Sequence, residues 1–515
     1  MKSTAVLAAL AIMLTGTAFV AATANAADSP APGTTPAPSA TATPTPGVTS
    51  STFPTASPTA NPTSTSTSTA SPSATPSLTA VAPPINGTSV VCPVVTSDIT
   101  QTQSDLVYSV ASKKLASATA GSKKRYPFGA LANQTKYVKT GPSAWTAGFF
   151  PGELWLMYQR TNDDRWLKRA NQYSAALIPV ANDKGTHDLG FMIGVPMSQA
   201  ASLEPTSKLK RAYLNAEITA AKSLARRYSN TVHAIRSASY GGKWGVIIDS
   251  AMNAPMMIQV GQWLGPEGDY LANEGEQHML TLATNFIRSN GSTHHRMAFN
   301  PKTGALIGPI AGQGLASTSS TWSRGQAWAI NGFARAYELT GKTEFLKAAE
   351  ATANYWMSRV PPGCIPAWDL DVSNDKAPRD SSAAAIAVSG LLTLARNEPS
   401  ADAAKTYNTY ARLTLGTLAT PGWLNTNTRN PGILLQQSLN VPALARDGSY
   451  VWGDYYFLEA LAQIAQSLPA PSPSASPSGT PAPTGSPAPT PTVSPTPGST
   501  GTVSPSATPK PSPTD

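Results

Sequence analysis

The feature that most constrains this chain is a helical rhythm that begins near Ser97 and continues to about residue 467. Apolar residues recur there in steps of three and four, the spacing that gathers them on one face of an α-helix. Start and stop signals, such as Asn162-Asp163-Asp164 and Thr340-Gly341, punctuate the pattern. It predicts twelve helices, at roughly 98–118, 147–160, 163–180, 190–203, 207–228, 249–264, 267–289, 325–341, 343–359, 379–396, 400–419 and 453–467.

Two kinds of helix alternate along this region. The segment IAVSGLLTLA at 386–395 is almost entirely apolar, whereas AAKTYNTYARLTLGTL at 403–418 has a polar face. An all-α fold follows, and paired helices of this kind predict an (α/α)6 barrel. In such a barrel six helical hairpins form a ring with apolar inner helices and amphipathic outer ones. A helical solenoid has the same local pattern, so the periodicity alone leaves both open.

The regions outside the helical unit have a different composition. Residues 27–88 and 469–515 consist mostly of Ser, Thr, Pro, Ala and Gly, and they hold most of the 47 prolines. Such segments cannot bury enough apolar surface to fold, so we expect disordered linkers there. We therefore expect a single catalytic domain over 89–468, because no Pro/Ser-rich break interrupts this region.

The first residues have the pattern of a signal peptide. Met1-Lys2 precede an apolar run from Ala5 to Ala22, and Ala24-Asn25-Ala26 has the small-x-small spacing of a cleavage site. This predicts removal of residues 1–26 and secretion. A membrane anchor is the alternative, but no stop-transfer flank follows the run, and the C-terminal tract has no apolar tail for a lipid anchor. We expect no membrane association.

Net charge and cysteine content limit the kinds of binding partner, disulfide and metal site that we expect. The formal net charge is +9, which suits an anionic partner or simply solubility. The basic residues are scattered, so we do not expect nucleic-acid binding, and we expect a monomer. Cys92 and Cys364 lie at opposite ends of the folded unit, and the sequence leaves open a disulfide or two separate buried thiols. No cysteine spacing indicates a metal site, and we expect neither metal nor cofactor.

One carboxylate has mainly apolar neighbours in the sequence. In the stretch GKWGVIIDSAMNAPMM at 242–257, Asp249 lies among Val, Ile and Met residues. Burying a lone carboxylate in apolar surroundings is unfavourable unless it is paired or used in chemistry. Asp249 is therefore the first candidate for a catalytic residue.

Further polar groups fall where inner helices would begin. Long loops rich in Gly, Pro, Trp and His, at 229–248, 290–322, 360–378 and 420–452, lead into several of these starts. If the loops emerge at one end of the barrel, their polar groups converge at one mouth. The segments concerned are Trp145–Gly152, His187–Met192, Ile248–Asn253, Thr321–Trp328, Arg379–Ala384 and Trp452–Phe457.

Asp188 and Asp249 form the predicted catalytic pair. Two carboxylates in one apolar pocket cannot both ionise easily, so one keeps its proton and can act as a general acid. The alternative is that aspartates at helix starts are caps, as we expect for Asp380 and Asp454. Arg324 has two interpretations as well: a two-pronged contact to a substrate carboxylate, or a buried ion pair with one of these aspartates. For single tryptophans the alternative to sugar stacking is core packing.

Taken together and in order, six motifs resemble those of the unsaturated glucuronyl hydrolases of glycoside hydrolase family 88. They are WTAGFFPG, HDLGFM, VIIDSAMNAPM, STWSRGQAW, PRDSSAAAIA and WGDYYFLEAL, spanning Trp145 to Leu461. The resemblance implies an (α/α)6 barrel and an enzyme acting on fragments left by polysaccharide lyases. These fragments carry a 4,5-unsaturated uronic acid at the non-reducing end.

The resemblance also implies roles for individual residues. Asp249 matches the general acid and base that protonates C4 of the enol ether, and Asp188 matches the second essential aspartate. With the apolar run around Asp249, this suggests that Asp249 is the protonated member and that Asp188 sustains its raised pKa. The matching pocket-lining positions are Trp145, His187, His295, Gln313, Trp322, Arg324 and Trp328.

Two departures from the family pattern concern the leaving sugar. Ala311-Gly312-Gln313-Gly314 stands where a His-Gln-Gly is expected, and Gln436 stands where a histidine is expected. They leave the linkage and sulfate preference open. Two other functions also stay open: an unsaturated rhamnogalacturonyl hydrolase acting on pectin fragments, and a non-catalytic saccharide-binding protein.

Overall fold

The computed structural model describes the helical unit and little beyond it. The described residues are 90–92, 97–119, 125–312, 314–372, 374, 376–426 and 429–468. The predicted signal peptide (1–26), the Ser/Thr/Pro-rich linker (27–88) and the C-terminal tract (469–515) lie outside them. In the part of the chain that the structure describes, no helix is long and apolar enough to cross a membrane.

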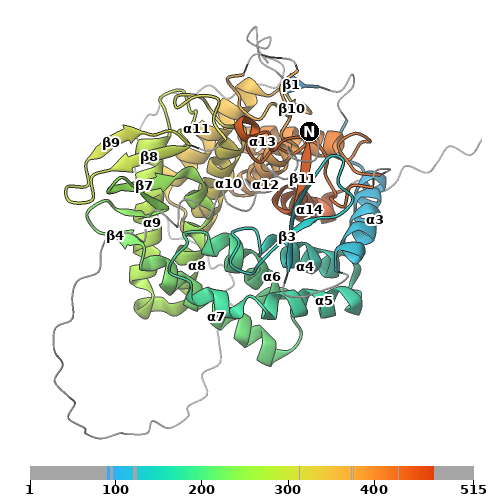
Figure 1. The fold of residues 1–515 in the computed structure, drawn as a ribbon, viewed down its shortest axis with the longest axis horizontal. Helices are drawn as coiled ribbons and strands as arrows, with labels where there is room; N and C mark the ends of the chain where they lie inside the picture. The colour runs from blue at the N-terminus through green and yellow to red at the C-terminus, as the bar shows by residue number, and fades with distance from the viewer. Residues whose placement is uncertain are drawn as a thin grey trace, which may run out of the picture. The chain divides into compact units, whose positions relative to one another are not determined.

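The described residues contain twelve α-helices, and each corresponds to one predicted range (Figure 1). Short 3-10 or π turns extend several of them, such as η3 (Gly190–Gly194), which leads directly into its helix, and η4 (Ile248–Met252), which precedes the next. The helices are α3 (Gln101–Ala118), α4 (Phe149–Thr161), α5 (Asp164–Ala175), α6 (Val195–Leu203), α7 (Ser207–Ala225), α8 (Ala254–Leu264), α9 (Asp269–Phe286), α10 (Ser323–Thr340), α11 (Thr343–Arg359), α12 (Ser381–Asn397), α13 (Ala401–Leu418) and α14 (Val451–Ile464).

The packing of these helices decides between a barrel and a solenoid. Along the inner ring α4 packs against α6, α8 against α10, α10 against α12 and α12 against α14, while η3 connects α6 with α8. The last inner helix, α14, packs against the first, α4, and so closes the ring. A solenoid would leave its first and last helices apart. The fold is therefore the predicted (α/α)6 barrel, with α3, α5, α7, α9, α11 and α13 outside.

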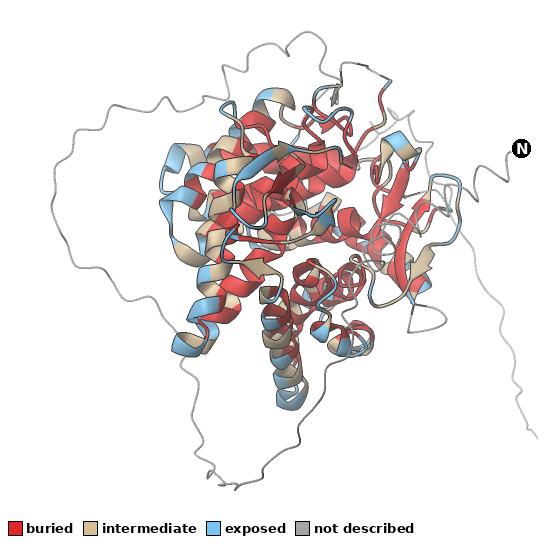
Figure 2. Ribbon diagram, turned by 60° about the vertical axis from the view of Figure 1, so that its left-hand side comes forward, coloured by how far each residue is buried: buried red, intermediate tan, exposed pale blue. Residues whose placement is uncertain are grey.

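Burial follows the predicted alternation of inner and outer helices. In α12 every residue from Ser381 to Leu394 is buried, as expected for a helix surrounded by others. In α13 buried positions such as Tyr407 and Tyr410 alternate with exposed ones. Figure 2 shows the same contrast, with red inner segments and pale blue on the outward faces of peripheral helices.

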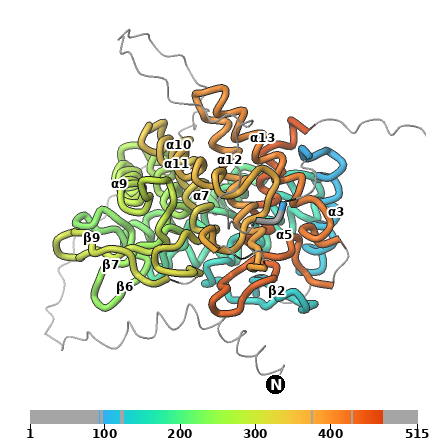
Figure 3. Tube along the Cα trace, turned by 90° about the horizontal axis from the view of Figure 1, so that it is seen from above, coloured from blue at the N-terminus to red at the C-terminus, as the bar shows by residue number. Residues whose placement is uncertain are grey.

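Short strands, which the helical periodicity did not predict, make up much of the long loops. Two larger sheets lie apart in Figures 1 and 3. One has the antiparallel order β6 (Ala238–Tyr240), β7 (Lys243–Ile247), β8 (Arg296–Phe299) and β9 (Leu306–Pro309). The other has the order β11 (Gly448–Tyr450), β2 (Tyr126–Leu131) and β3 (Val138–Thr140). Strands of two to six residues paired across long sequence gaps leave little local periodicity to detect.

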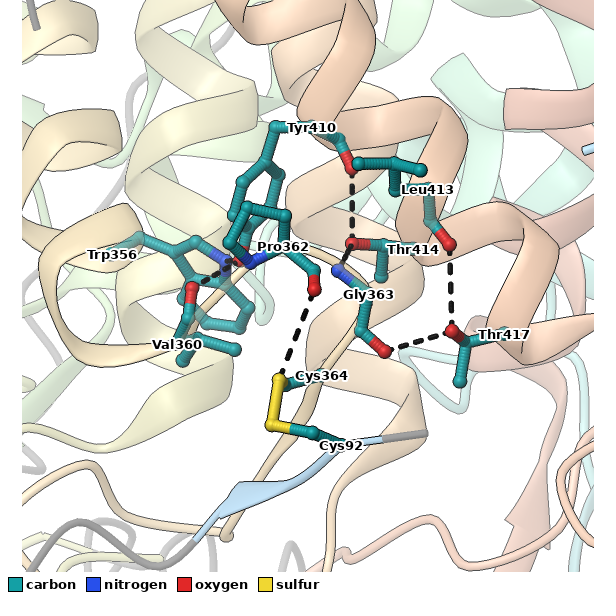
Figure 4. Close-up of a disulfide and its surroundings, with 10 residues drawn as sticks. All are labelled: Cys92, Trp356, Val360, Pro362, Gly363, Cys364, Tyr410, Leu413, Thr414 and Thr417. Atoms are coloured by element: carbon teal, nitrogen blue, oxygen red, sulfur yellow. Dashed lines mark hydrogen bonds between the residues drawn. A yellow bond between two sulfur atoms is a disulfide. The ribbon is translucent and has the colours of Figure 1, made fainter. Parts of the chain in front are cut away.

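Cys92 and Cys364 form a disulfide, which settles the alternative that the sequence left open (Figure 4). The bond joins residues 272 apart, next to the pairing of β1 (Val90–Val91) with β10 (Ile365–Pro366). The segment before Cys364 is also fastened to α13: Gly363 N–H donates to Thr414 Oγ1 (3.3 Å), and Thr417 Oγ1 donates to the Gly363 carbonyl (2.8 Å). The N-terminal segment is thus covalently attached to the barrel.

Candidate active site

The six motif segments lie at the starts of the six inner helices. Each outer helix returns the chain to the same end of the ring, so all inner helices begin at that end. The residues that mark these starts are Trp145 before α4, Asp188 before η3 and α6, Asp249 in η4 before α8, Trp322 before α10, Asp380 before α12 and Asp454 in the first turn of α14. The predicted convergence at one mouth is therefore what the fold produces.

The two predicted catalytic aspartates belong to segments that are packed directly together. Asn253 connects them: its Oδ1 accepts the N–H of Phe191 (3.0 Å), and its Nδ2 donates to the carbonyl of Asp249 (3.2 Å). A Cβ added at Gly190 would meet Asn253 Cα at 2.5 Å, so only glycine permits this approach. Both carboxylates stay partly open, with side chains 18% exposed for Asp188 and 17% for Asp249.

Each aspartate has a histidine beside it. His187 Nε2 lies 3.6 Å from Asp188 Oδ1, and His295 Nε2 lies 3.6 Å from Asp249 Oδ2. His187 Nδ1 lies 3.2 Å from Ser250 Oγ, the hydroxyl next to Asp249. Asp249 Oδ2 is buried and faces His295, so the 17% of the side chain that stays exposed is the part that a substrate can reach.

The pKa shifts of the pair reverse the distribution expected from the sequence. Burial raises the pKa of Asp188, and the charge of Asp249 adds to this effect, while His187 and Thr186 act against it. Burial also acts to raise the pKa of Asp249, but His295, His187 and Arg324 outweigh it, and the pKa of Asp249 lies below its ordinary value. The expectation that Asp249 has the raised pKa is thus wrong for the protein without substrate, because the apolar run in the sequence gives no sign of the surrounding histidines.

Aromatic rings surround this end of the barrel. The Trp145 ring lies 5.0 Å from that of Trp452 and 5.7 Å from that of Phe191, and it keeps partial exposure. Trp322 lies 4.5 Å from the His295 ring, centroid to centroid. The partly open Trp145 ring can stack against the C–H face of a sugar, whereas Trp322 is buried.

Trp328 has a different environment from the other predicted tryptophans. It has no exposed surface and packs against Phe191 (5.1 Å) and Tyr456 (5.4 Å). This is the arrangement that the core-packing alternative describes. Contact between Trp328 and a substrate stays a prediction.

Arg324 lies at the centre of a buried polar network. Its Nη1 pairs with Asp380 Oδ2 at 3.0 Å and also donates to the carbonyl of Ser438, while its Nη2 donates to the Leu439 carbonyl at 2.9 Å. The guanidinium lies over the Trp322 ring, 4.3 Å from its centroid. The ion-pair interpretation of Arg324 describes this arrangement, and its two-pronged contact to a substrate carboxylate stays a prediction.

The two aspartates expected to be helix caps behave differently. Asp380 caps α12 as expected, because its carboxylate accepts the N–H groups of Ser382 and Ala383. Asp454 does not cap its own helix: it accepts the N–H groups of Ile433 and Leu434, both at 2.8 Å, and so holds the preceding loop. Burial raises the pKa of Asp454 to about 6.

The two segments that depart from the family pattern adjoin the site. A Cβ at Gly312 would lie 2.9 Å from His295 Nδ1, and one at Gly314 would lie 3.0 Å from the Trp322 ring, so this loop rests on both predicted site residues. Gln313 itself lies outside the described residues. Gln436 adopts a left-handed φ of 57°, and its carbonyl accepts the N–H of Ser381 at the start of α12.

Sequence reasoning missed Asn253 and Ser250, although both lie in a motif that it singled out. Asn253 stands four residues after Asp249, one helical turn away, where a side chain can reach back to the Asp249 carbonyl. A buried amide at such a spacing is a usable signal. The contact between Ser250 and His187 joins residues 63 apart and has no counterpart in the local pattern.

The fold and the site define a class: a helical-barrel glycosidase with a histidine-flanked aspartate pair. No family model matches the sequence, but known proteins do. An unsaturated glucuronyl hydrolase from Formosa agariphila is 34% identical over 325 residues, which cover 62% of this chain and 79% of the relative. An unsaturated glucuronyl hydrolase from Bacillus sp. strain GL1 is 30% identical over 346 residues, covering 65% and 89%.

A solved structure supports the same assignment. The crystal structure of an unsaturated glucuronyl hydrolase specific for heparin has a TM-score of 0.65 and 29% identity, over 70% of this chain and 97% of the other. The chain belongs to the unsaturated glucuronyl hydrolase family.

Proposed function

We propose that this enzyme removes a 4,5-unsaturated glucuronic acid from the non-reducing end of lyase-generated oligosaccharides. The observation that carries the proposal is the pair of segments holding Asp188 and Asp249, which Asn253 joins at the start of the inner helices. Family membership supports the same reaction: a Streptococcus agalactiae relative, 26% identical with a TM-score of 0.60 over 74% of this chain, was solved in complex with dGlcA-GalNAc6S.

The geometry suits protonation at carbon rather than attack by a nucleophile. The Asp249 carboxyl group, which is partly exposed at the mouth and supported by His295, is placed to give a proton to C4 of the enol ether. Water then adds at C5 and gives its proton back to the same carboxylate. The resulting hemiketal opens, the bond to the rest of the sugar breaks, and the leaving sugar departs with a hydroxyl group.

The substrate itself supplies the protonation state that this step requires. A uronic acid carboxylate near the pair adds negative charge, which raises the pKa of both aspartates. Asp249, whose pKa is lowered in the protein without substrate, then holds a proton more readily. Asp188, with His187 beside it, remains to orient the ring.

The aspartate pair is tested by single substitutions. Asp249→Asn should lower kcat by about 10²–10⁴-fold with little effect on substrate binding, because the amide cannot deliver a proton. The assay follows loss of the enol-ether absorbance with unsaturated hyaluronan, chondroitin, heparin and pectin-derived substrates. Asp402→Asn, on the exposed face of α13, is the matched control and should behave as wild type.

Each alternative function has its own outcome in this assay. An Asp249→Asn enzyme with normal turnover would refute the role of that residue. Turnover of pectin-derived fragments alone would identify an unsaturated rhamnogalacturonyl hydrolase. Calorimetric binding without turnover of any substrate would identify a saccharide-binding protein.

We also propose that the enzyme is exported and that residues 1–26 are removed. The proposal rests on the apolar run and the Ala24-Asn25-Ala26 spacing. Export of the full chain should give medium protein whose first residue is Ala27, determined by N-terminal sequencing. Cell-retained protein that begins at Met1 would contradict it.

A further inference from the structure

A cavity opens within the barrel, and the segments that hold the aspartate pair contribute Gly190 and Met252 to its wall. Its volume is 420 Å³, within the range of small-molecule sites. Its polar wall comes from the later turns of inner helices, including Gln159 on α4, Gln199 on α6, Gln259 on α8 and Glu459 on α14. The predicted catalytic residues stand at the beginnings of those helices and do not line the cavity, so most of its wall lies farther along the ring than the mouth.

One buried carboxyl group in the cavity wall lacks a full set of partners. Glu217, on the outer helix α7, has no exposed surface and lines the cavity. Ser198 Oγ donates to its Oε1 at 2.7 Å, but its Oε2 has no hydrogen-bond partner among the described residues. A buried polar oxygen left without a partner is unfavourable, and a ligand hydroxyl in the cavity would satisfy it.

The charged groups of the cavity wall give an anionic ligand no partner. Arg335 is already neutralised, because its Nη2 pairs with Glu459 Oε1 at 2.6 Å and its Nε donates to Asn331 Oδ1 at 2.6 Å. Glu338, another lining residue, pairs with Arg396. Glu217 adds a carboxyl group with no cation paired to it among the described ion pairs. A uronate would therefore meet no unpaired positive charge in this wall.

The remaining surface suits a neutral ligand with many hydroxyl groups. The glutamine side chains offer both donors and acceptors. Tyr455, Tyr456 and Met256 provide apolar surface for the C–H groups of a sugar ring. Gln199 Nε2 donates to Tyr455 Oη (3.1 Å), which in turn donates to Glu459 Oε1 (3.1 Å), so the polar wall is held in place before any ligand enters.

We propose that this cavity is a second saccharide site, which binds one or two rings of a neutral sugar with Glu217 as an anchor. The site differs from the catalytic one in the charge of its ligand. The catalytic site receives the anionic end of an oligosaccharide, whereas this cavity accepts a sugar without a carboxylate.

Calorimetric titration of the full chain tests the proposal with glucose, galactose and N-acetylglucosamine as probes. Glucuronate and ethanolamine serve as anionic and cationic comparison ligands. At least one neutral sugar should bind with a dissociation constant of about 1 mM or tighter. Gln259→Trp, which fills the cavity, should weaken that binding by about tenfold or more, and Glu217→Gln should weaken it about threefold or more.

Control variants separate this cavity from the catalytic mouth. Asn273→Trp, at an exposed position of α9, and Trp145→Ala, at the mouth, should leave neutral-sugar binding unchanged. Neither cavity variant should change kcat/KM on the unsaturated substrate, and circular dichroism checks that both fold. Four results would overturn the proposal: no sugar binding up to about 100 mM, tighter binding of glucuronate or ethanolamine than of any sugar, loss of binding in Trp145→Ala, or unchanged binding in both cavity variants.

Discussion

At the scale of single residues, the role of a charged side chain depends on the residues with which it pairs. From the sequence, Asp380 was expected to be a helix cap, and Arg324 either a substrate contact or a member of a buried ion pair with one of the aspartates. The structure makes them a buried pair at 3.0 Å, with the Arg324 side chain 3% exposed and that of Asp380 fully buried. A residue that already has buried partners holds loops and helix starts in register, here the Ser438–Leu439 segment against α12.

Glu217 gives a prediction about stability and pH. Burial raises its pKa from 4.5 to about 8, although the hydrogen bond from Ser198 acts in the other direction. A raised pKa in the folded state means that the proton binds more tightly to Glu217 there, and this binding stabilises the fold. The stabilisation is complete below pH 4.5. It is lost as the pH rises to about 8.

Glu217→Gln should remove this pH dependence, because the amide stays neutral. Relative to wild type, the variant should gain unfolding free energy, on the order of a few kcal/mol, between about pH 5 and pH 8. Urea denaturation at several pH values measures the difference. An identical pH profile for the two proteins would show that Glu217 is already ionised in the fold.

At the scale of elements, the position of Asp249 depends on how closely η4 approaches α10. A Cβ placed on Gly332 of α10 would meet the carbonyl oxygen of Ala251 in η4 at 2.4 Å. Both residues are buried, so backbone would have to move to admit a methyl group. Helix packing therefore contributes to the placement of the carboxylate two residues earlier.

Gly332→Ala should lower both stability and activity. The expected loss is about 1–3 kcal/mol of unfolding free energy from overpacking. The shift of η4 should lower kcat/KM by about tenfold or more, since small displacements of a catalytic group weaken catalysis strongly. Gly141→Ala is the matched control, because a Cβ there meets nothing within 4 Å. Equal melting temperatures and activities for Gly332→Ala and wild type would contradict the packing argument.

At the scale of the whole molecule, the ring is held at two places far apart in sequence. The packing of α14 on α4 closes the barrel, and the disulfide attaches the segment before α3 to the loop before α12. Cross-linking residues 272 apart restricts the unfolded chain much more than the folded one.

Replacing both cysteines, as Cys92→Ser with Cys364→Ser, should lower the free energy of unfolding by about 3–5 kcal/mol. The variant should keep a kcat/KM close to that of wild type at room temperature, because neither cysteine belongs to the segments that carry the aspartate pair. Urea denaturation with and without reductant measures the change, and reductant should affect only the wild-type protein. Equal midpoints for wild type and variant in the absence of reductant would contradict the prediction.

The sequence by itself determined the properties that depend on the local spacing of residues. Helix periodicity predicted twelve helices and their inner and outer alternation, and the apolar run around Asp249 marked a carboxylate in an unusual setting. Motif order identified the family, because six short segments in a fixed order are a specific pattern. These properties depend on residues close to one another along the chain.

Only the tertiary structure decided the properties that depend on residues far apart in the chain. It closed the ring, formed the disulfide, paired Arg324 with Asp380, and raised the pKa of Asp188 while lowering that of Asp249. The physical reason is that burial and electrostatic interaction depend on distance in space. His295 lies 46 residues after Asp249 in the chain, yet the fold places its imidazole 3.6 Å from the carboxylate.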